Sequence, residues 1–264
     1  MSKSARIPSP RRTVSARTST TGCATTNAKT RRCSPTSTRK TPTPTPSSRR
    51  CKHRKTSSTT KSSPASSDSS VPARDHGYWY YSRFETGKDY PIHARRADRD
   101  GLDALAIQAA NNSGDFAGEE ILLNVNQLAE GHDYYSASMV DISKDNQKML
   151  WADDTNGRRQ YTLRVTDLKS GTVLPDTIPG SNGDAVWADD GETFYYIEND
   201  PETLLSKRVK KHTLGSDPKT DPVVYEEADD SYYLGVDRSR DEKYLTIHAS
   251  STVSDELRYT PAAN

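Results

Sequence analysis

Three segments of this chain resemble one another and recur at intervals of about 45 and 50 residues. In each, a polar turn leads into an aromatic or apolar strand, as in Ile142–Met149, Trp187–Phe194 and Asp237–Tyr244. A strand–turn–strand unit repeated roughly every 40–50 residues is typical of β-propeller blades, which are four-stranded sheets that bury their faces against their neighbours. An antiparallel sandwich, the alternative, has turns about every 8–12 residues and no longer period. The repeat therefore favours a propeller.

Other short segments after Gly77 also have the character of strands. They are rich in aromatic and β-branched residues, or alternate apolar with polar residues as half-buried strands do. The clearest are Tyr78–Phe84, Ile92–Ala97, Tyr161–Asp167 and Pro222–Tyr225. No long segment has a helical period. We therefore predict an all-β fold, a β-propeller with about four blades within residues 73–264.

The charge of the chain changes near Pro72. Residues 1–72 hold 16 of the 37 Lys and Arg residues but one of the 36 acidic residues, Asp68. They are dominated by Ser, Thr and Pro and contain no Leu, Phe, Trp or Tyr. Such a segment cannot bury enough apolar surface to offset the conformational entropy that is lost on folding. Residues 1–72 are therefore predicted to form a disordered basic tail, and residues 73–264 to form the folded domain.

We predict no catalytic, cofactor-binding or metal-binding residue in this chain. Gly180-Ser-Asn-Gly183 has the wrong spacing for the turn that carries a catalytic serine, and an ordinary turn is expected there. Asp98–Asp103 begins like a calcium loop, but the twelfth position is Ala109 instead of Glu, so we expect a solvated turn. The histidines are scattered and are predicted to be surface or packing residues: His53, His76, His93, His132, His212 and His248.

The cysteines and the hydropathy of the chain indicate its compartment. Cys23, Cys33 and Cys51 all lie in the tail, so the folded domain needs neither a disulfide nor a Cys-ligated metal. No apolar run approaches the roughly 18 residues that cross a membrane. The basic N-terminus lacks the apolar segment of a secretory signal. We expect a cytoplasmic protein with no cofactor and no membrane partner.

Four stretches of the folded domain closely resemble oligopeptidase B, a branch of the prolyl oligopeptidase family of serine peptidases. They are Gly77–Arg96, Glu119–Ser136, Asp154–Gly171 and Phe194–Leu204. The resemblance runs from about Asp68 to the end of the chain, with the motifs in the family's order. It implies a seven-bladed propeller that covers an α/β-hydrolase domain, and hydrolysis of short peptides after Arg or Lys.

The resemblance also implies that the catalytic Ser, Asp and His lie in the hydrolase domain, and none of them has a counterpart in this chain. We expect the chain to hold about four of the seven blades and to be inactive alone, because the nucleophile and its base are missing. Its partners would be short peptide substrates and the missing C-terminal hydrolase domain. In the complete enzyme the propeller would be a lid that admits short peptides and excludes folded proteins.

The tail lacks the family's segment before the first blade, which contains Trp-Leu-Arg-Asp-Asp. A shifted reading frame explains the difference. When the last base of each codon is joined to the first two bases of the next, Thr20–Thr26 can encode Asp-Asp-Trp-Leu-Arg-Asp-Asp. Lys29–Ser47 can encode the next family segment in the same way. We interpret roughly Pro10 to Ser66 as a frameshifted stretch.

A non-catalytic binding module is the alternative function. The propeller would then act alone, or the basic tail would neutralise the phosphates of a nucleic acid. The tail has no aromatic residues on which bases could stack, which weakens that interpretation. If the tail results from a frameshift, its charge is incidental, and we predict no nucleic-acid partner.

Overall fold

The computed structural model describes residues 68–99 and 101–263, and all of these belong to one compact unit. The predicted tail and its frameshifted stretch therefore lie outside the described residues, apart from residues 68–72. In that short part, Ser69 forms a β-bridge with Arg83. The hydroxyl of Ser70 also accepts a hydrogen bond from the backbone of Ser82. Pairing with the first blade thus begins a few residues before Ala73.

The first sheet is antiparallel and has four strands in chain order; we call it blade 1. Its strands are β1 (Ala73–Asp75), β2 (Tyr78–Phe84), β3 (Pro91–Ala97) and β4 (Glu119–Asn124). Helix α1 (Ala104–Ser113) precedes β4, and helix α2 (Val125–Leu128) follows it. The strand predicted at Tyr78–Phe84 is confirmed, and the strand predicted at Ile92–Ala97 starts one residue earlier.

The second sheet has seven strands and contains two blades that share strand β8. Blade 2 consists of β5 (Ser136–Ile142), β6 (Lys148–Asp154), β7 (Tyr161–Asp167) and the first half of β8 (Thr172–Trp187). Blade 3 consists of the second half of β8, β9 (Thr193–Asn199), β10 (Ser206–Thr213) and β11 (Val223–Glu226), with the short 3-10 helix η1 (Pro218–Thr220) before β11. Strand β8 pairs first with β7 and then with β9. It is therefore the outer strand of blade 2 and the inner strand of blade 3.

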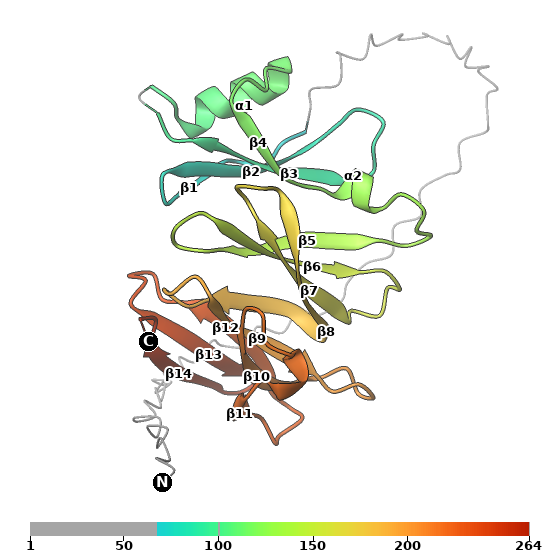
Figure 1. Cartoon of the computed structure of the whole chain (residues 1–264), viewed down its shortest axis with the longest axis vertical. Helices are drawn as coiled ribbons and strands as arrows, with labels where there is room; N and C mark the ends of the chain where they lie inside the picture. The colour runs from blue at the N-terminus through green and yellow to red at the C-terminus, as the bar shows by residue number, and fades with distance from the viewer. Residues whose placement is uncertain (1–67, 100, 264) are drawn as a thin grey trace, which may run out of the picture. The chain divides into compact units, whose positions relative to one another are not determined.

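The third sheet, blade 4, has three strands. They are β12 (Tyr233–Arg238), β13 (Tyr244–Ser250) and β14 (Asp255–Pro261). Figure 1 shows the blades following one another in chain order, from blue-green blade 1 to red blade 4. Three blades of four strands and a fourth of three strands match the predicted partial propeller, and the predicted fold class is confirmed.

The three repeated sequence segments lie at equivalent places, in the turn between the inner strand and the next strand of blades 2, 3 and 4. In each turn a carboxylate accepts a hydrogen bond from the backbone: Asp145, Asp190 and Asp241. In each, the residue after this Asp has a positive φ: Asn146 (58°), Gly191 (62°) and Glu242 (59°). The repeat in the sequence is therefore a repeat of turn geometry.

The apolar core lies between successive blades. Between blades 1 and 2 it includes Leu123, Val125, Tyr135, Met149 and Trp151. Between blades 2 and 3 it includes Leu150, Leu163, Val165, Trp187 and Phe194. Between blades 3 and 4 it includes Val186, Ile197, Val209, Leu234 and Leu245. Each blade thus buries a face against the next, which is how a propeller obtains a core from sheets that are too small to enclose one.

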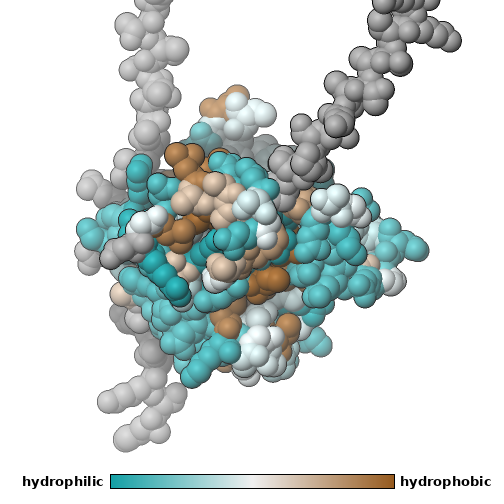
Figure 2. Space-filling view, turned by 90° about the horizontal axis from the view of Figure 1, so that it is seen from above, coloured by the Kyte–Doolittle hydropathy of each residue, from teal (hydrophilic) through white to brown (hydrophobic). Residues whose placement is uncertain are grey.

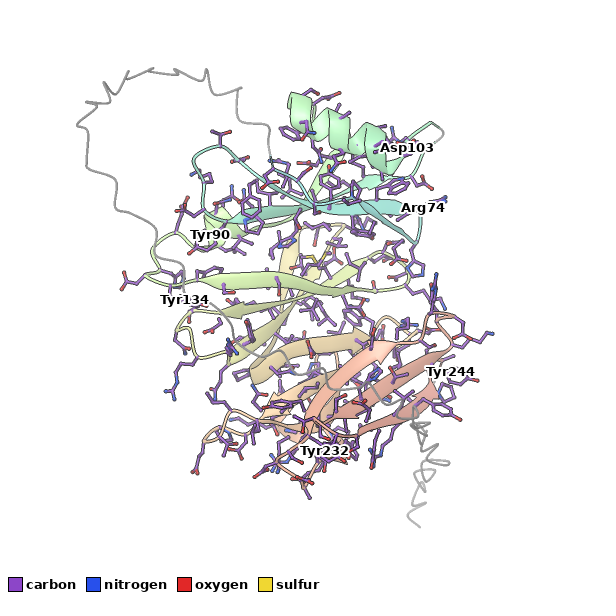
Figure 3. The ribbon with its side chains drawn as sticks, turned by 180° about the vertical axis from the view of Figure 1, so that it is seen from behind. Arg74, Tyr90, Asp103, Tyr134, Tyr232 and Tyr244 are labelled. Carbon is purple, nitrogen blue, oxygen red and sulfur yellow. The ribbon has the colours of Figure 1, made fainter. Side chains whose placement is uncertain are left out.

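Helix α1 is the main element that we did not predict from the sequence. The carboxylate of Asp103, labelled in Figure 3, accepts a hydrogen bond from the backbone of the first turn (2.8 Å) and caps the helix. Gly114, with a φ of 77°, ends it. Ile107 is fully buried against Tyr81 of blade 1. The stretch Asp98–Asp103, which we expected to be a solvated turn, therefore leads into a helix. The apolar face of this helix is too narrow to produce a clear helical period of apolar residues in the sequence.

The turn predicted at Gly180–Gly183 is wrong. These residues lie inside β8, where the strand changes its partner from β7 to β9. Gly180 and Gly183 have φ angles of 75° and 99°, which residues with a side chain rarely adopt. A Cβ atom on Gly183 would also lie 3.2 Å from the ring of Tyr161. The two glycines therefore redirect a continuous strand between blades and do not reverse the chain.

Apolar side chains reach the surface on blade 1 and near α1. The large ones are Phe84, Leu105, Phe116 and Ile121. Figure 2, which looks down on the α1 side, shows apolar patches among polar surface. Blade 1 has a neighbouring blade on one side only, so some apolar surface on the other side is expected. Among the described residues, no helix is long and apolar enough to cross a membrane.

Candidate functional site

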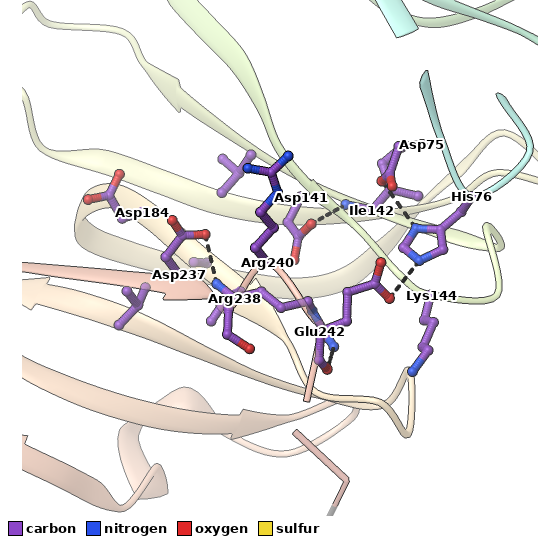
Figure 4. A pocket seen from close by; sticks show the side chains of 15 residues that line it. Asp75, His76, Asp141, Ile142, Lys144, Asp184, Asp237, Arg238, Arg240 and Glu242 are labelled. Carbon is purple, nitrogen blue, oxygen red and sulfur yellow. Dashed lines mark hydrogen bonds and ion pairs between the residues drawn. The ribbon is translucent and has the colours of Figure 1, made fainter. Parts of the chain in front are cut away.

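The inner strands β1, β5, β8 and β12 surround a cavity of about 360 Å³ (Figure 4). We call it the inner-strand pocket. It is lined by Asp75, His76, Val140, Asp141, Ile142, Lys144, Asp184, Ala185, Val186, Val236, Asp237, Arg238, Ser239, Arg240 and Glu242. The pocket is thus lined by residues from all four blades. These residues meet because the first strand of each blade is its innermost strand.

Carboxylates outnumber the Lys and Arg side chains in the lining of the inner-strand pocket, five to three. Lys144 and Arg238 both form ion pairs with Asp189, at 2.9 Å and 2.5 Å. Asp189 itself does not line the pocket. In contrast, no ion pair to Lys or Arg is formed by Asp141, Asp184 or Asp237 among the ion pairs of the described residues. The pocket can therefore offer carboxylate oxygens to a cationic group.

Asp141 is held between two backbone amides. One carboxylate oxygen accepts a hydrogen bond from the N–H of Ile142 (2.8 Å), and the other accepts one from the N–H of Trp187 on blade 3 (2.9 Å). Burial nevertheless dominates and raises the pKa of Asp141 to about 6. Burial also raises the pKa of Asp184, with a further contribution from the negative charge of Asp237. Burial therefore opposes the ionisation of the carboxylates inside the pocket.

The pKa values of two aspartates in one hairpin are expected to be shifted in opposite directions from the usual value of 3.8. Asp141 should titrate at about 6. Burial is the largest single effect on Asp145 and opposes its ionisation, but the hydrogen bonds from Ser143 and the backbone of Gln147 together outweigh it and lower its pKa. Carboxyl carbon shifts followed by NMR from pH 2 to 8 will test both. Titration of Asp141 at or below the Asp145 midpoint would contradict the buried pocket wall.

The raised pKa of Asp141 also gives a pH dependence of stability. A carboxyl whose pKa is higher in the folded than in the unfolded chain loses its proton on unfolding between the two values. Its contribution to the free energy of unfolding therefore falls as the pH rises from 3.8 to about 6. Asp141→Asn should remove this loss, so the stability of the variant relative to the unsubstituted protein should increase from pH 4 to pH 7. Urea unfolding at both pH values measures the difference.

The turns beside the pocket are joined to one another by hydrogen bonds, and we call them the turn ring. The amide of Asn146 in blade 2 donates to the backbone oxygen of His76 in blade 1 (2.9 Å). Lys144 of blade 2 and Arg238 of blade 4 both bind Asp189 of blade 3. The ring is completed by a contact of 2.9 Å between the imidazole of His76 and the carboxylate of Glu242 in blade 4.

The group Asp75, His76 and Glu242 has the composition of a metal site, but its geometry fits hydrogen bonds from the imidazole to the two carboxylates better. Nδ1 of His76 faces Asp75 at 3.1 Å, and Nε2 faces Glu242 at 2.9 Å. A single metal ion binds an imidazole through one nitrogen, whereas each carboxylate here faces a different nitrogen. We therefore describe this group as a hydrogen-bonded bridge.

The histidines were predicted to be packing or surface residues, and His53 lies outside the described residues. His212 is fully buried between Asp176 and Asp221. His93 lies within hydrogen-bond distance of Ser82, and His132 packs against Tyr135. We did not foresee the pocket from the sequence. The available signal was the Asp at equivalent places before two of the repeated turns, Asp141 and Asp237.

The four successive blades form an open, partial β-propeller. Residues 49–264 match the family model of the prolyl oligopeptidase N-terminal β-propeller domain. This chain belongs to the prolyl oligopeptidase family, as the resemblance of its motifs implied.

Two curated relatives and two solved structures illustrate the similarity. Dipeptidyl aminopeptidase BI of Pseudoxanthomonas mexicana is 57% identical over 197 residues, which are 75% of this chain and 27% of the relative. Protease 2 of Moraxella lacunata is 30% identical over 193 residues, which are 72% and 26% of the two chains. The oligopeptidase B structures from Leishmania major and Trypanosoma brucei superpose with TM-scores of 0.66 and 0.62, each at 26% identity over 75% of this chain and 26% of the other. The chain spans about a quarter of the length of the curated relatives it matches.

Proposed function

We propose that this chain is the substrate-admitting propeller of a serine peptidase that hydrolyses short peptides after Arg or Lys. The α/β-hydrolase domain that the family resemblance implies would supply the catalytic groups. The propeller would act as a lid, because a channel between the inner strands admits an extended peptide and excludes a folded protein. Membership of the family and the peptidase names of its relatives support this proposal.

The observation that carries the preference for basic peptides is the charge of the inner-strand pocket. Asp141, Asp184 and Asp237 line it without an ion pair to Lys or Arg of the described residues. The lining holds five carboxylates and three Lys or Arg side chains, and a concave surface with an excess of one charge sign concentrates ligands of the opposite sign. A peptide with Arg or Lys side chains would thus be attracted into the pocket, and an acidic peptide would be repelled.

The chain alone is expected to have no peptidase activity. A catalytic nucleophile and a base that activates it are needed for hydrolysis. The serine that lines the pocket, Ser239, donates its hydroxyl hydrogen to Asp241 and not to a histidine. The measurement is cleavage of an Arg–amide substrate by the purified protein, beside a mock purification. Cleavage above the mock level would overturn the assignment of catalysis to a separate domain.

A chimaera tests the proposed role in substrate admission. Residues 68–264 would replace the matching segment of the Pseudoxanthomonas mexicana relative. Asp184→Asn in this chimaera is expected to lower kcat/KM for peptides with several basic residues by roughly two- to fivefold, because rim charges mainly affect association. Asp255→Asn on β14, which does not line the pocket, is the control. Equal kcat/KM for both variants would contradict steering by the pocket.

A dipeptidyl aminopeptidase is the second candidate function. It is favoured by the 57% identity to the relative of that name. The two candidates differ in whether the substrate needs a free N-terminus. An enzyme that contains this propeller should cleave an Arg–amide with a blocked N-terminus if it is an endopeptidase. It should require a free amine two residues before the scissile bond if it removes dipeptides.

A further inference from the structure

We propose that His76 is a protonation-dependent latch that joins blade 1 to blade 4 at the edge of the inner-strand pocket. In the protonated state both imidazole nitrogens donate hydrogen bonds, one to Asp75 of blade 1 and one to Glu242 of blade 4. In the neutral state a single nitrogen can donate, so the two carboxylates compete for one hydrogen, and the positive charge that attracts Glu242 is lost. The pocket would therefore be more tightly closed at acidic pH than at alkaline pH.

The geometry of the bridge requires two protons on the imidazole. Oδ2 of Asp75 lies 3.1 Å from Nδ1, and Oε2 of Glu242 lies 2.9 Å from Nε2 (Figure 4). Ionised carboxylates only accept hydrogen bonds, so each nitrogen must carry a hydrogen for both contacts to form. The His76 side chain keeps 28% of its exposure and that of Glu242 keeps 39%. The bridge is therefore screened by solvent, and its strength is modest.

The position of His76 in the turn ring makes it the switch. The other junctions of the ring use the amide of Asn146, the ammonium of Lys144 and the guanidinium of Arg238. None of these groups changes its charge between pH 5 and 8, whereas histidine does so in this range. The His76–Glu242 contact also spans 166 residues of sequence. Within the turn ring, a change of pH would thus loosen one junction and leave the others intact.

The charges around His76 favour its protonated form. Burial opposes protonation, but the hydrogen bonds and negative charges of Glu242 and Asp75 outweigh it, so the pKa of His76 is raised above 6.5. The other charged groups that line the pocket come from β5, the β5–β6 turn, β8, β12 and the β12–β13 turn. They are Asp141, Lys144, Asp184, Asp237, Arg238 and Arg240. A raised pKa of a base means that the stabilisation is complete below 6.5 and is lost as the pH rises through the raised value.

Two variants at exposed turns separate the latch from a general effect of pH. Glu242→Gln keeps the shape of the side chain and removes its charge. His76→Asn removes the titrating group, and Asn tolerates the positive φ of 40° at this position. Lys144→Gln is the matched control, because it weakens a junction of the same ring that does not titrate near neutral pH.

Imidazole titration by NMR on the full chain is the first measurement. The His76 midpoint is expected above 6.5 in the unsubstituted protein and lower in the Glu242→Gln variant, whereas Lys144→Gln should leave it above 6.5. A midpoint at or below 6.5, or one that Glu242→Gln does not lower, would overturn the proposal.

Hydrogen exchange of the β12–β13 turn, residues 239–243, is the second measurement. After correction for the intrinsic effect of pH, protection should fall by about two- to fivefold between pH 5.5 and 8.5, the range expected for an exposed ion pair. His76→Asn and Glu242→Gln should abolish the fall, and Lys144→Gln should retain it. The same fall in His76→Asn as in the unsubstituted protein would show that another group is responsible.

Discussion

Replacement of His212 by alanine is expected to lower the free energy of unfolding by about 3–5 kcal/mol. The imidazole is fully buried, and it lies 2.9 Å from the carboxylate of Asp221 and 3.1 Å from that of Asp176. Those side chains are 2% and 5% exposed. Removal of the ring would leave each of the two buried carboxylates with one remaining hydrogen-bond donor, the hydroxyl of Tyr196 for Asp221 and the N–H of Gly215 for Asp176. Neither donor replaces the imidazole that lies between the two carboxylates.

Urea unfolding followed by tryptophan fluorescence measures this effect. His248→Ala is the control, because this histidine lies on β13 with an exposed side chain. It should change stability by no more than about 0.5 kcal/mol. The same loss for both variants would mean that the Asp176–His212–Asp221 group does not hold blades 2 and 3 together.

Trp187→Ala should cost about 3–5 kcal/mol, which is the usual range for removal of a buried tryptophan. Trp187 is fully buried at the end of the inner strand of blade 3. Its ring meets that of Phe194 edge-on, with 5.3 Å between the ring centroids. Both belong to the core between blades 2 and 3, so the cavity left by alanine would separate two blades along a shared face.

Trp187→Phe is the matched comparison. The indole N–H of Trp187 has no hydrogen-bond partner in the structure, so phenylalanine loses no hydrogen bond and leaves a smaller cavity. A loss of about 1–2 kcal/mol is expected. The midpoints of urea unfolding should follow the order unsubstituted, Phe, Ala. An alanine variant as stable as the phenylalanine variant would argue that the inter-blade core can collapse around the gap.

The aromatic strands and the polar turns between them were predictable because they depend on neighbours in the sequence. Alternation of apolar and polar residues located β2 and β7, and the repeated turns located the inner hairpins of blades 2, 3 and 4. Asp145, Asp190 and Asp241 cap their own turns, so their effect is local. Family motifs in the same strands then identified the propeller.

Helix α1 and the course of β8 were not predictable in the same way. The helix has two buried residues, Ile107 and Asn111, which are too few for a clear period. Its place depends on the blade 1 surface that Ile107 covers. The pair Gly180 and Gly183 is a turn signal by composition, but pairing of β8 with two different strands holds the segment extended.

The sequence alone determined the strands, their turns and the repeat that makes blades, because these follow from the conformational preferences and spacing of adjacent residues. The tertiary structure decided which charges meet. His76 reaches Glu242 across 166 residues, and His212 reaches Asp176 across 36. The inner-strand pocket likewise needs one strand from each of four blades. Such contacts arise only when separate blades pack, since no local pattern records which side chain of a distant strand will lie opposite.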